Sequence, residues 1–410
     1  MSTFISRAAV LVTALVPLAG FAAPLSLEAA LELAVQRSEA ARAARAGLAS
    51  ATEASRAAGQ LADPTLRVGI ENLPVTRNDR FSVTRDSMTM KRIGISQEWL
   101  SRDKREARRA AADAAASREA VQVWVAAAEA RLQTALAYVD AFYANEVLRL
   151  TTLLEHHAQE QVETARARLA SATGSSQEVL LLAGARGAAE DESAEVRQQE
   201  SVAQVALYRW AGTQSRELAP IPTLAIPTEE DFVAGDPAVA ALQRDIEVAR
   251  KAAAVAAADR KPNWTWEVAY GQRSGYSDMV TVGVSIPLTV LPGERQDRDT
   301  AAKMALVDKA EADLAEASRA AAAEYRLLKS DARRLQERID RYRAGVVTPA
   351  QQRIAVTVAA YRSNQGSLVT VFEARHAEVE QQRKLLVLQR DLARRQVQLA
   401  YRTVATEAAR

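Results

Sequence analysis

Long stretches of this chain repeat apolar residues every three or four positions, the spacing of one face of a helix. The pattern runs from Ser26 to about Leu61, from Ser101 to Ala172, on to about Trp210, and through most of the second half. At about 1.5 Å per residue, the second stretch predicts a rod on the order of 100 Å long. Its apolar positions recur about every 3.67 residues, typical of a nearly straight helix: Leu132, Leu136, Val139, Tyr143, Val147, Leu150 and Leu154.

Four short segments instead alternate apolar with polar or small residues, the pattern of a strand with two different faces. They predict strands at about residues 64–73, 88–98, 263–271 and 278–288. In the second segment the alternation slips phase between Met90 and Ile93, so we expect a β-bulge at Lys91-Arg92.

Two Gly-Ser breaks interrupt the long helical stretches in similar surroundings. They are "ATGSSQEV" at residues 172–179 and "NQGSLVTV" at residues 364–371, and their glycines, Gly174 and Gly366, are 192 positions apart. A Pro-rich linker at residues 213–236 separates the two halves. Each half, 23–212 and 237–410, predicts the same unit of helix, two strands, long helix, turn and returning helix, so the chain is a tandem duplication.

The second long arm differs from the first at one place. Gly345 and Pro349 lie within its helical pattern. They predict a kink or a short interruption there.

The N-terminal segment has the layout of a secretory signal, with Arg7 followed by an apolar run and small residues. We expect cleavage after Ala22, giving a signal peptide at residues 1–22. The alternative, a membrane anchor, is disfavoured because the apolar run is shorter than the ~20 residues that a spanning helix needs. The chain has no cysteine, which excludes disulfides, thiolate metal sites and a lipid on an N-terminal cysteine.

Charge and motifs give little reason to expect catalysis. The chain carries 53 basic and 51 acidic residues, so there is no global field to attract nucleic acid. It has neither a Gly-rich phosphate loop nor an HExxH motif. His156 and His157 are adjacent and would point about 100° apart on a helix, and we expect them and His376 to be solvated. The predicted protein is not an enzyme and has no catalytic residue, cofactor or metal site.

The predicted strands have the length that crosses a bilayer when tilted. One apolar and one small or polar face suits lipid on one side and water on the other. Trp99, Trp264 and Tyr270, near strand ends, are candidates for an aromatic belt at the membrane interface. The alternative is a soluble sheet covered by helices, which would need partners or solvent for the polar residues Arg67, Glu71, Glu267 and Thr281.

Four strands cannot close a barrel, and open edges are not tolerated in hydrocarbon. The smallest sensible assembly with a water-filled lumen is three protomers, giving twelve strands. The long helices of each protomer would then form a coaxial helical tube. The predicted fold is mainly α with membrane β.

Several segments together resemble the TolC family of outer-membrane efflux channels over nearly the whole mature chain. They are "LEAALELAVQRSEAARAARAGLASA", "ADPTLRVGIENL", "ISQEWLSRDKREARRAAADAA", "RARLASATGSSQEVLLLAGAR" and "AAYRSNQGSLVTVFEARHAEVEQQRKLL". The segment around Lys104-Arg105 and "DPTLRVGIEN" are most similar to the CzcC and CusC branch, which serves heavy-metal pumps.

The resemblance implies a homotrimer with a twelve-stranded β-barrel in the bacterial outer membrane and an α-helical coiled-coil barrel in the periplasm. It also implies a passive conduit in a tripartite efflux system, with a periplasmic adaptor and an inner-membrane transporter of the resistance-nodulation-division class. Heavy-metal cations are candidate substrates through the branch similarity. The competing class is a soluble periplasmic coiled-coil adaptor or scaffold.

In such a channel the two Gly-Ser breaks are hairpin tips at the periplasmic entrance, and their small residues could insert between adaptor hairpins. The candidate docking residues are Gly174, Ser175, Asn364, Gly366, Ser367 and Leu368. Glycine tolerates the left-handed conformation that ends a helix tightly, and asparagine is next best. The family usually has glycine where Ala172 and Asn364 stand.

A ring of carboxylates near the tips could attract cations and help to set a closed diameter. The candidate gate residues are Glu178 and Glu373, with Arg186, Arg362 and Arg375 as pairing partners across subunits. The alternative for each is an ordinary surface charge.

Overall fold

The computed structural model describes residues 24–215 and 217–404, so the predicted signal peptide at residues 1–22 lies outside the described residues. In the first half the elements are α1 (Leu27–Arg37), α2 (Glu39–Ala57), β1 (Thr65–Glu71), β2 (Met90–Trp99), α3 (Arg102–Ala170) and α4 (Ser176–Ala211). The linker carries α5 (Glu229–Ala234). The second half contains α6 (Pro237–Ala258), β3 (Trp264–Gln272), β4 (Met279–Ser285), α7 (Gln296–Tyr342), the π-helix η1 (Arg343–Val347), α8 (Thr348–Arg362) and α9 (Leu368–Tyr401).

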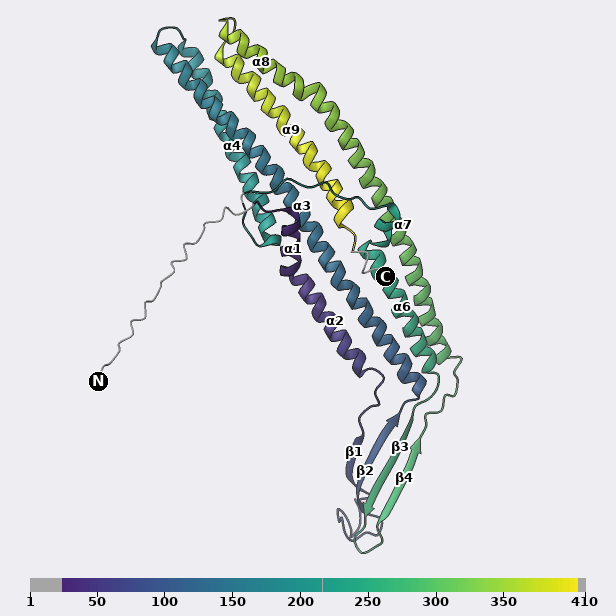
Figure 1. Ribbon diagram of the computed structural model, residues 1–410. Helices are drawn as coiled ribbons and strands as arrows, with labels where there is room; N and C mark the ends of the chain where they lie inside the picture. The colour runs from purple at the N-terminus through teal and green to yellow at the C-terminus, as the bar shows by residue number, and fades with distance from the viewer. Residues whose placement is uncertain (1–23, 216, 405–410) are drawn as a thin grey trace, which may run out of the picture.

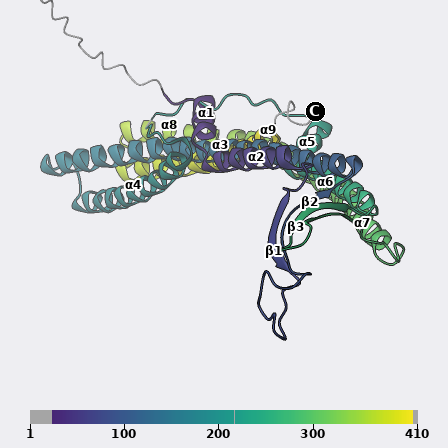
Figure 2. The same ribbon diagram turned by 90° about the horizontal axis from the view of Figure 1, so that it is seen from below.

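The molecule is elongated, with the sheet at one end and two helical hairpins at the other (Figure 1). The α3–α4 hairpin and the α8–α9 hairpin lie side by side, and α3 packs against α9. Seen along the other axis, the helices form one shallow layer, and the sheet projects from its edge (Figure 2).

Serine residues set the starts of several helices. The Ser101 hydroxyl accepts a hydrogen bond from the Lys104 amide at the start of α3. The prediction of one helix from Ser26 to about Leu61 is wrong, because Ser38 is extended and caps α2, with 3.1 Å between its hydroxyl and the Ala41 nitrogen. Within the described part of the chain, no helix is both long enough and apolar enough to cross a bilayer.

The described strands form one antiparallel sheet in the order β1-β2-β3-β4. The pairing of β1 with β2 runs without interruption from Thr65↔Ser96 to Glu71↔Met90, so the predicted bulge at Lys91-Arg92 is absent. The phase slip has a simpler cause: Met88 lies before the strand, and Met90 is an apolar residue on the face of Glu71, opposite to the face of Ile93. The strand expected at 278–288 ends at Ser285, two residues before Pro287, which cannot donate to a ladder.

The second long arm is interrupted where Gly345 and Pro349 predict a kink. Five residues of π-helix separate α7 from α8, and the chain continues in the same general direction through them. A π-helix inserts an extra residue into the turn and rotates the following side chains relative to those before it. The first long arm, α3, is a single helix of 69 residues.

A buried tyrosine holds the linker against each long arm. Tyr138 of α3 is fully buried, and its hydroxyl lies 2.7 Å from the carbonyl oxygens of Leu25 and Ala219. Tyr325 of α7 donates to the Pro227 carbonyl at 2.9 Å and packs against Phe232 of α5. The linker thus crosses both halves of the molecule at mid-length.

Candidate functional site

The two hairpin tips end their first helix in the same way. At the end of α3, the amide of Ala172 donates to the Leu169 carbonyl and the amide of Thr173 to the Arg168 carbonyl, at 3.0 and 2.9 Å. This pair of bonds is a Schellman motif. At the end of α8 the equivalent bonds join Asn364 to Tyr361 and Gln365 to Ala360, at 3.1 and 2.8 Å.

The left-handed residues of these motifs are Ala172 and Asn364, with φ of 57° and 59°, whereas Gly174 and Gly366 are not left-handed. The two glycines are needed for space instead. A Cβ on Gly174 would lie 2.9 Å from the Leu169 nitrogen, and one on Gly366 would lie 3.2 Å from the Tyr361 nitrogen. At both glycines the turn therefore lies close against the end of the preceding helix.

A carboxylate joins the two tips. Glu178, in the first turn of α4, accepts a hydrogen bond from the Leu368 amide at 3.1 Å, at the start of α9. Leu368 is itself buried, at 5% exposure, so this predicted docking residue is largely covered within the chain. The position of Glu178 at a helix N-terminus favours its negative charge.

The other predicted tip residues remain near the surface. Ser175 and Ser367 cap α4 and α9 through their hydroxyls, at 3.2 Å from the Glu178 and Thr370 amides. Glu373 and Arg362 are exposed, and Arg375 is half-buried.

Two predicted arginine partners have local carboxylates within the chain. Arg186 pairs with Glu190 one turn along α4 at 2.6 Å. Arg375 lies near Glu160, whose pKa is lowered by a hydrogen bond from His157 and, more weakly, by the positive charge of Arg375.

One face of the sheet is a continuous exposed apolar surface. Its cross-strand rows are Val68↔Ile93↔Tyr270↔Val280 and Leu66↔Ile95↔Val268↔Val282. Every side chain in these rows is at least 42% exposed, and Val68 and Val282 reach 73%. A monomeric soluble protein rarely leaves such a patch uncovered.

The predicted aromatic belt residues lie at two levels of this face. Trp99 and Trp264 are cross-strand partners with ring centroids 5.9 Å apart, at the end of the sheet nearest the helices. Tyr270 lies six residues further along β3, about 20 Å away at the usual rise of a strand. Its hydroxyl donates to Asp278 in the loop that follows.

The opposite face carries charge. Arg92 of β2 bridges Glu71 of β1 and Glu267 of β3, with 2.8 Å between Arg92 Nη2 and Glu267 Oε1. Its cross-strand neighbours are Gly69 and Gly271, which leave room for the guanidinium. The carboxylates expected to need partners thus find one on their own face.

A second polar cluster fastens the sheet to the helices. Lys104 is only 3% exposed, and its ammonium group donates to Asn263 at 2.7 Å and pairs with Asp259 at 3.3 Å. Asp103 pairs with Lys261 at 2.6 Å in the same junction. These contacts join the start of α3 to the turn between α6 and β3.

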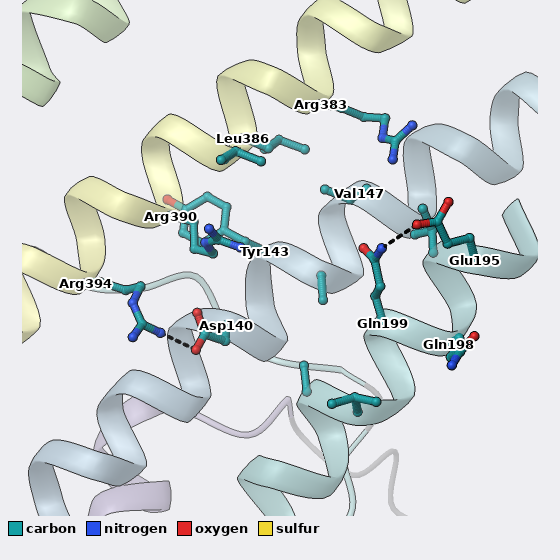
Figure 3. A pocket seen from close by; sticks show the side chains of 15 residues that line it. Asp140, Tyr143, Val147, Glu195, Gln198, Gln199, Arg383, Leu386, Arg390 and Arg394 are labelled. Atoms are coloured by element: carbon teal, nitrogen blue, oxygen red, sulfur yellow. Dashed lines mark hydrogen bonds and ion pairs between the residues drawn. The ribbon is translucent and has the colours of Figure 1, made fainter. Parts of the chain in front are cut away.

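A groove runs between α3, α4 and α9 at mid-length (Figure 3). Asp140 of α3 pairs with Arg394 of α9 at one end, and Arg383 lies at the other. Burial raises the pKa of the Tyr143 hydroxyl on its floor, and the nearby Glu146 charge raises it further. Ion pairs thus hold the charged side chains at both ends of the groove.

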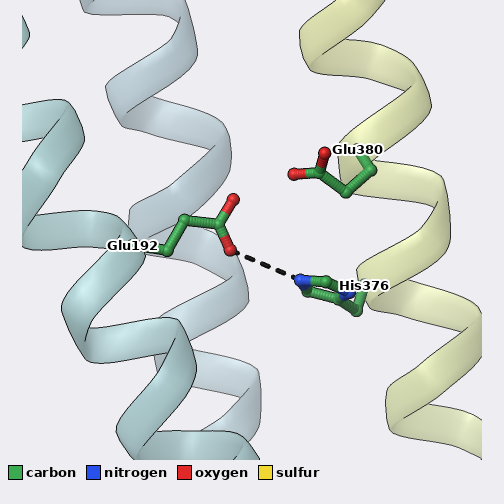
Figure 4. A group of neighbouring side chains, drawn as sticks. All are labelled: Glu192, His376 and Glu380. Carbon is green, nitrogen blue, oxygen red and sulfur yellow. Dashed lines mark hydrogen bonds and ion pairs between the residues drawn. The ribbon is translucent and has the colours of Figure 1, made fainter.

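Beyond this groove, Glu192 of α4 faces His376 and Glu380 of α9 (Figure 4). His376 was expected to be a solvated histidine, yet its Nε2 lies 3.3 Å from Glu192 Oε2. The sequence indicates two members of this cluster, because His376 and Glu380 are four residues apart on one helix face. Nothing in it pointed to Glu192, 184 positions earlier.

No protein-family profile matches the chain, and no curated relative matches it by sequence. Solved structures do. The outer membrane protein VceC from Vibrio cholerae aligns with a TM-score of 0.72 at 19% identity, over 92% of this chain and 95% of VceC. The Campylobacter jejuni CmeC outer membrane channel aligns with a TM-score of 0.74 at 12% identity, over 92% and 85% of the two chains. This chain has the outer-membrane channel fold.

CusC, described as forming a transmembrane channel, has the same fold with a TM-score of 0.68 at 14% identity, over 92% of this chain and 91% of CusC. The fold predicted from the sequence, long helices with four strands per chain, is confirmed. In the outer-membrane channel fold of this chain, the hairpin tips and the sheet lie at opposite ends of the molecule.

Proposed function

We propose that this chain is one protomer of a trimeric outer-membrane efflux channel. The observation that carries the proposal is the exposed apolar face of the sheet, with the charged Arg92 cluster on the other face. Lipid would cover the first face, and the second would line a water-filled lumen. The strand edges of β1 and β4 have no partner strand within the described chain, and copies of the chain would supply one.

In this proposal the long helices form a periplasmic tube and the hairpin tips lie at its entrance. The tips would dock to a periplasmic adaptor, which would connect them to an inner-membrane transporter of the resistance-nodulation-division class. The exposed residues Gly366 and Ser175 would make the contact, with Glu373 and Arg362 as candidate gate charges facing the axis. The conduit is passive, so the channel itself needs no catalytic group.

Heavy-metal cations are the proposed cargo. The support is the sequence resemblance to the CzcC and CusC branch, together with the shared fold of CusC. Within the described strands, the lumen face carries two guanidinium groups and three carboxylates, a net charge of about −1 per protomer that would favour cations over anions. These residues are Arg67, Arg92, Glu71, Glu98 and Glu267.

Two neighbouring residues of β4 give a matched test. Val282 lies on the apolar face and Thr281 on the other. An arginine at a lipid-facing position near the bilayer midplane costs about 2–4 kcal/mol, whereas a lumen position tolerates it. We therefore expect Val282→Arg to block insertion and channel conductance in planar bilayers, and Thr281→Arg to keep a conducting pore with weaker cation preference.

Equal tolerance of both substitutions would refute the assignment of the faces. If the unsubstituted protein stays soluble without detergent and gives no conductance, the soluble scaffold is the better description.

A further inference from the structure

We propose that Glu192, His376 and Glu380 form a binding site for one divalent transition-metal ion per chain. The three residues come from both repeats: Glu192 from α4, and His376 and Glu380 from α9. Their ligand atoms all lie within 4.8 Å of one another (Figure 4). The site is contained within one chain, so the proposal does not depend on the channel assembly.

The geometry is close to what a small ion needs. A tetrahedral ion with bonds of about 2.1 Å holds its ligands about 3.4 Å apart. No ligand pair here would have to close by more than about 1.4 Å, a shift that glutamate side chains can make by changing rotamer. A water could fill the remaining position, because the His376 and Glu380 side chains are 44% and 45% exposed.

The imidazole is held in place before any ion arrives. The ring of His376 stacks on Phe372 with centroids 5.9 Å apart and planes at 17°, and Phe372 is anchored in the core at 8% exposure. Its Nε2 points to Glu192. A preset ring loses less entropy when it binds an ion.

The ligand types select the class of ion. One imidazole with two carboxylates suits borderline dications such as Zn²⁺, Ni²⁺ and Cu²⁺. Mg²⁺ and Ca²⁺ prefer sites made only of oxygen atoms.

Arg383 would compete with a metal ion for the two carboxylates of the site. Its guanidinium pairs with Glu192 and, at 2.7 Å, with Glu380. With a neutral imidazole, the four side chains carry a net charge of about −1, so an entering dication would leave the site with excess positive charge unless Arg383 moved away. Metal and Arg383 therefore compete for the same carboxylates.

The position of the site would let a bound ion link the two hairpins. His376 lies eight residues into α9, about 12 Å from the tip. Glu192 lies 16 residues into α4, about 24 Å from the first tip, so a bound ion would tie α4 of the first hairpin to α9 of the second. Occupancy would oppose separation of the two hairpins.

The test is a titration of the full chain, purified in detergent and stripped with chelator, with Zn²⁺ alone in a calorimeter. We expect saturation at one ion per chain. His376→Asn and Glu380→Gln each remove a ligand and should weaken binding by at least about tenfold. Arg383→Gln removes the competitor and should strengthen it, and adding His376→Asn should abolish the gain.

His156→Asn is the matched control, because His156 is another helix histidine near a glutamate, 3.3 Å from Glu160. It should leave the affinity unchanged. Circular dichroism confirms that each variant is folded, and Zn²⁺ should raise the melting temperature of the wild type but not of His376→Asn.

Three results would overturn the site: no saturable binding at one ion per chain, equal affinity in His376→Asn, or an equal loss in His156→Asn. If Arg383→Gln failed to strengthen binding, the assignment of Arg383 as competitor would be overturned.

Discussion

The two hairpin tips share the pattern Ser-x-x-Gly-Ser, at residues 171–175 and 363–367, and the same turn geometry, but they begin their second helices differently. In the second tip, Thr370 and Ser367 cap each other in a closed capping box. In the first tip, the equivalent position is Glu178, which reaches instead to the Leu368 amide of the other hairpin. One substitution in a duplicated motif thus turns a local cap into a link between the repeats.

The helices that lead to the two tips differ more, both in burial and in continuity. Near the first tip, α3 buries Leu154, Ala158 and Val162, whereas α8 buries no residue along its whole length. The π-helix also separates α8 from α7 in the second arm. We therefore expect the second hairpin to be the more mobile one, with Glu178 as a contact that restrains it.

The glycines give the largest expected contrast between the tips. Gly174→Ala forces a Cβ against backbone at 2.9 Å and should destabilise the first tip by about 2–3 kcal/mol. Gly366→Ala meets backbone at 3.2 Å and should cost less, about 1 kcal/mol. Amide hydrogen exchange at residues 168–180 and 360–372 measures the loss of stability at each tip. Equal losses in the two variants would contradict the expected difference between the tips.

The next largest effect on stability is expected at Tyr138 and Tyr325, the two tyrosines that hold the linker. Tyr138→Phe removes a fully buried hydroxyl whose single proton is shared between the Leu25 and Ala219 carbonyls, and should cost about 1–2 kcal/mol. The Leu25 carbonyl keeps the Ala219 amide as a donor at 2.9 Å, so the loss falls on the Ala219 carbonyl. Tyr325→Phe removes the donor to the Pro227 carbonyl at a slightly more exposed site and should cost about 1 kcal/mol. Chemical denaturation of the two variants in detergent gives the comparison. A larger loss in Tyr325→Phe would contradict it.

Tyr138 also makes the stability of the fold depend on pH. Burial raises the pKa of Tyr138 to about 12 from an ordinary value of 10.0. The neutral phenol therefore contributes stability that is complete below pH 10 and is lost as the pH rises towards 12. Tyr138→Phe should show a smaller fall in stability over that window.

The smallest effect is expected at the link between the tips. Glu178→Ala removes the acceptor for the Leu368 amide and should speed hydrogen exchange at the start of α9, by the equivalent of about 1 kcal/mol. Glu373→Ala, an exposed carboxylate in the second hairpin, is the matched control and should change little. If exchange rises only within α4, Glu178 is an ordinary local cap.

The periodic parts of the molecule could be predicted from the sequence. The alternation around Val68 and Val282 and the Gly-Ser breaks are local patterns, and local patterns are set by neighbouring residues. The interruption at Gly345 was also predicted, because glycine and proline weaken the interior of a helix.

What could not be predicted depends on contacts between the repeats. Glu178 was proposed as a gate charge because its partner, Leu368, lies 190 positions away and offers a backbone amide that no residue type reveals. His376 was expected to be solvated for the same reason, since Glu192 comes from another helix. The left-handed conformation was expected of the tip glycines and, next, of Asn364. Asn364 adopts it, whereas in the first tip Ala172 adopts it in place of Gly174.

The central claim is that the sheet needs copies of itself, because its edge strands β1 and β4 have no partner strand among the described residues. The mass of the particle tests this claim most directly. Native mass spectrometry of the purified full chain, released from detergent micelles, should give three chains in each particle. A single chain that stays in solution after the detergent is removed would contradict the account.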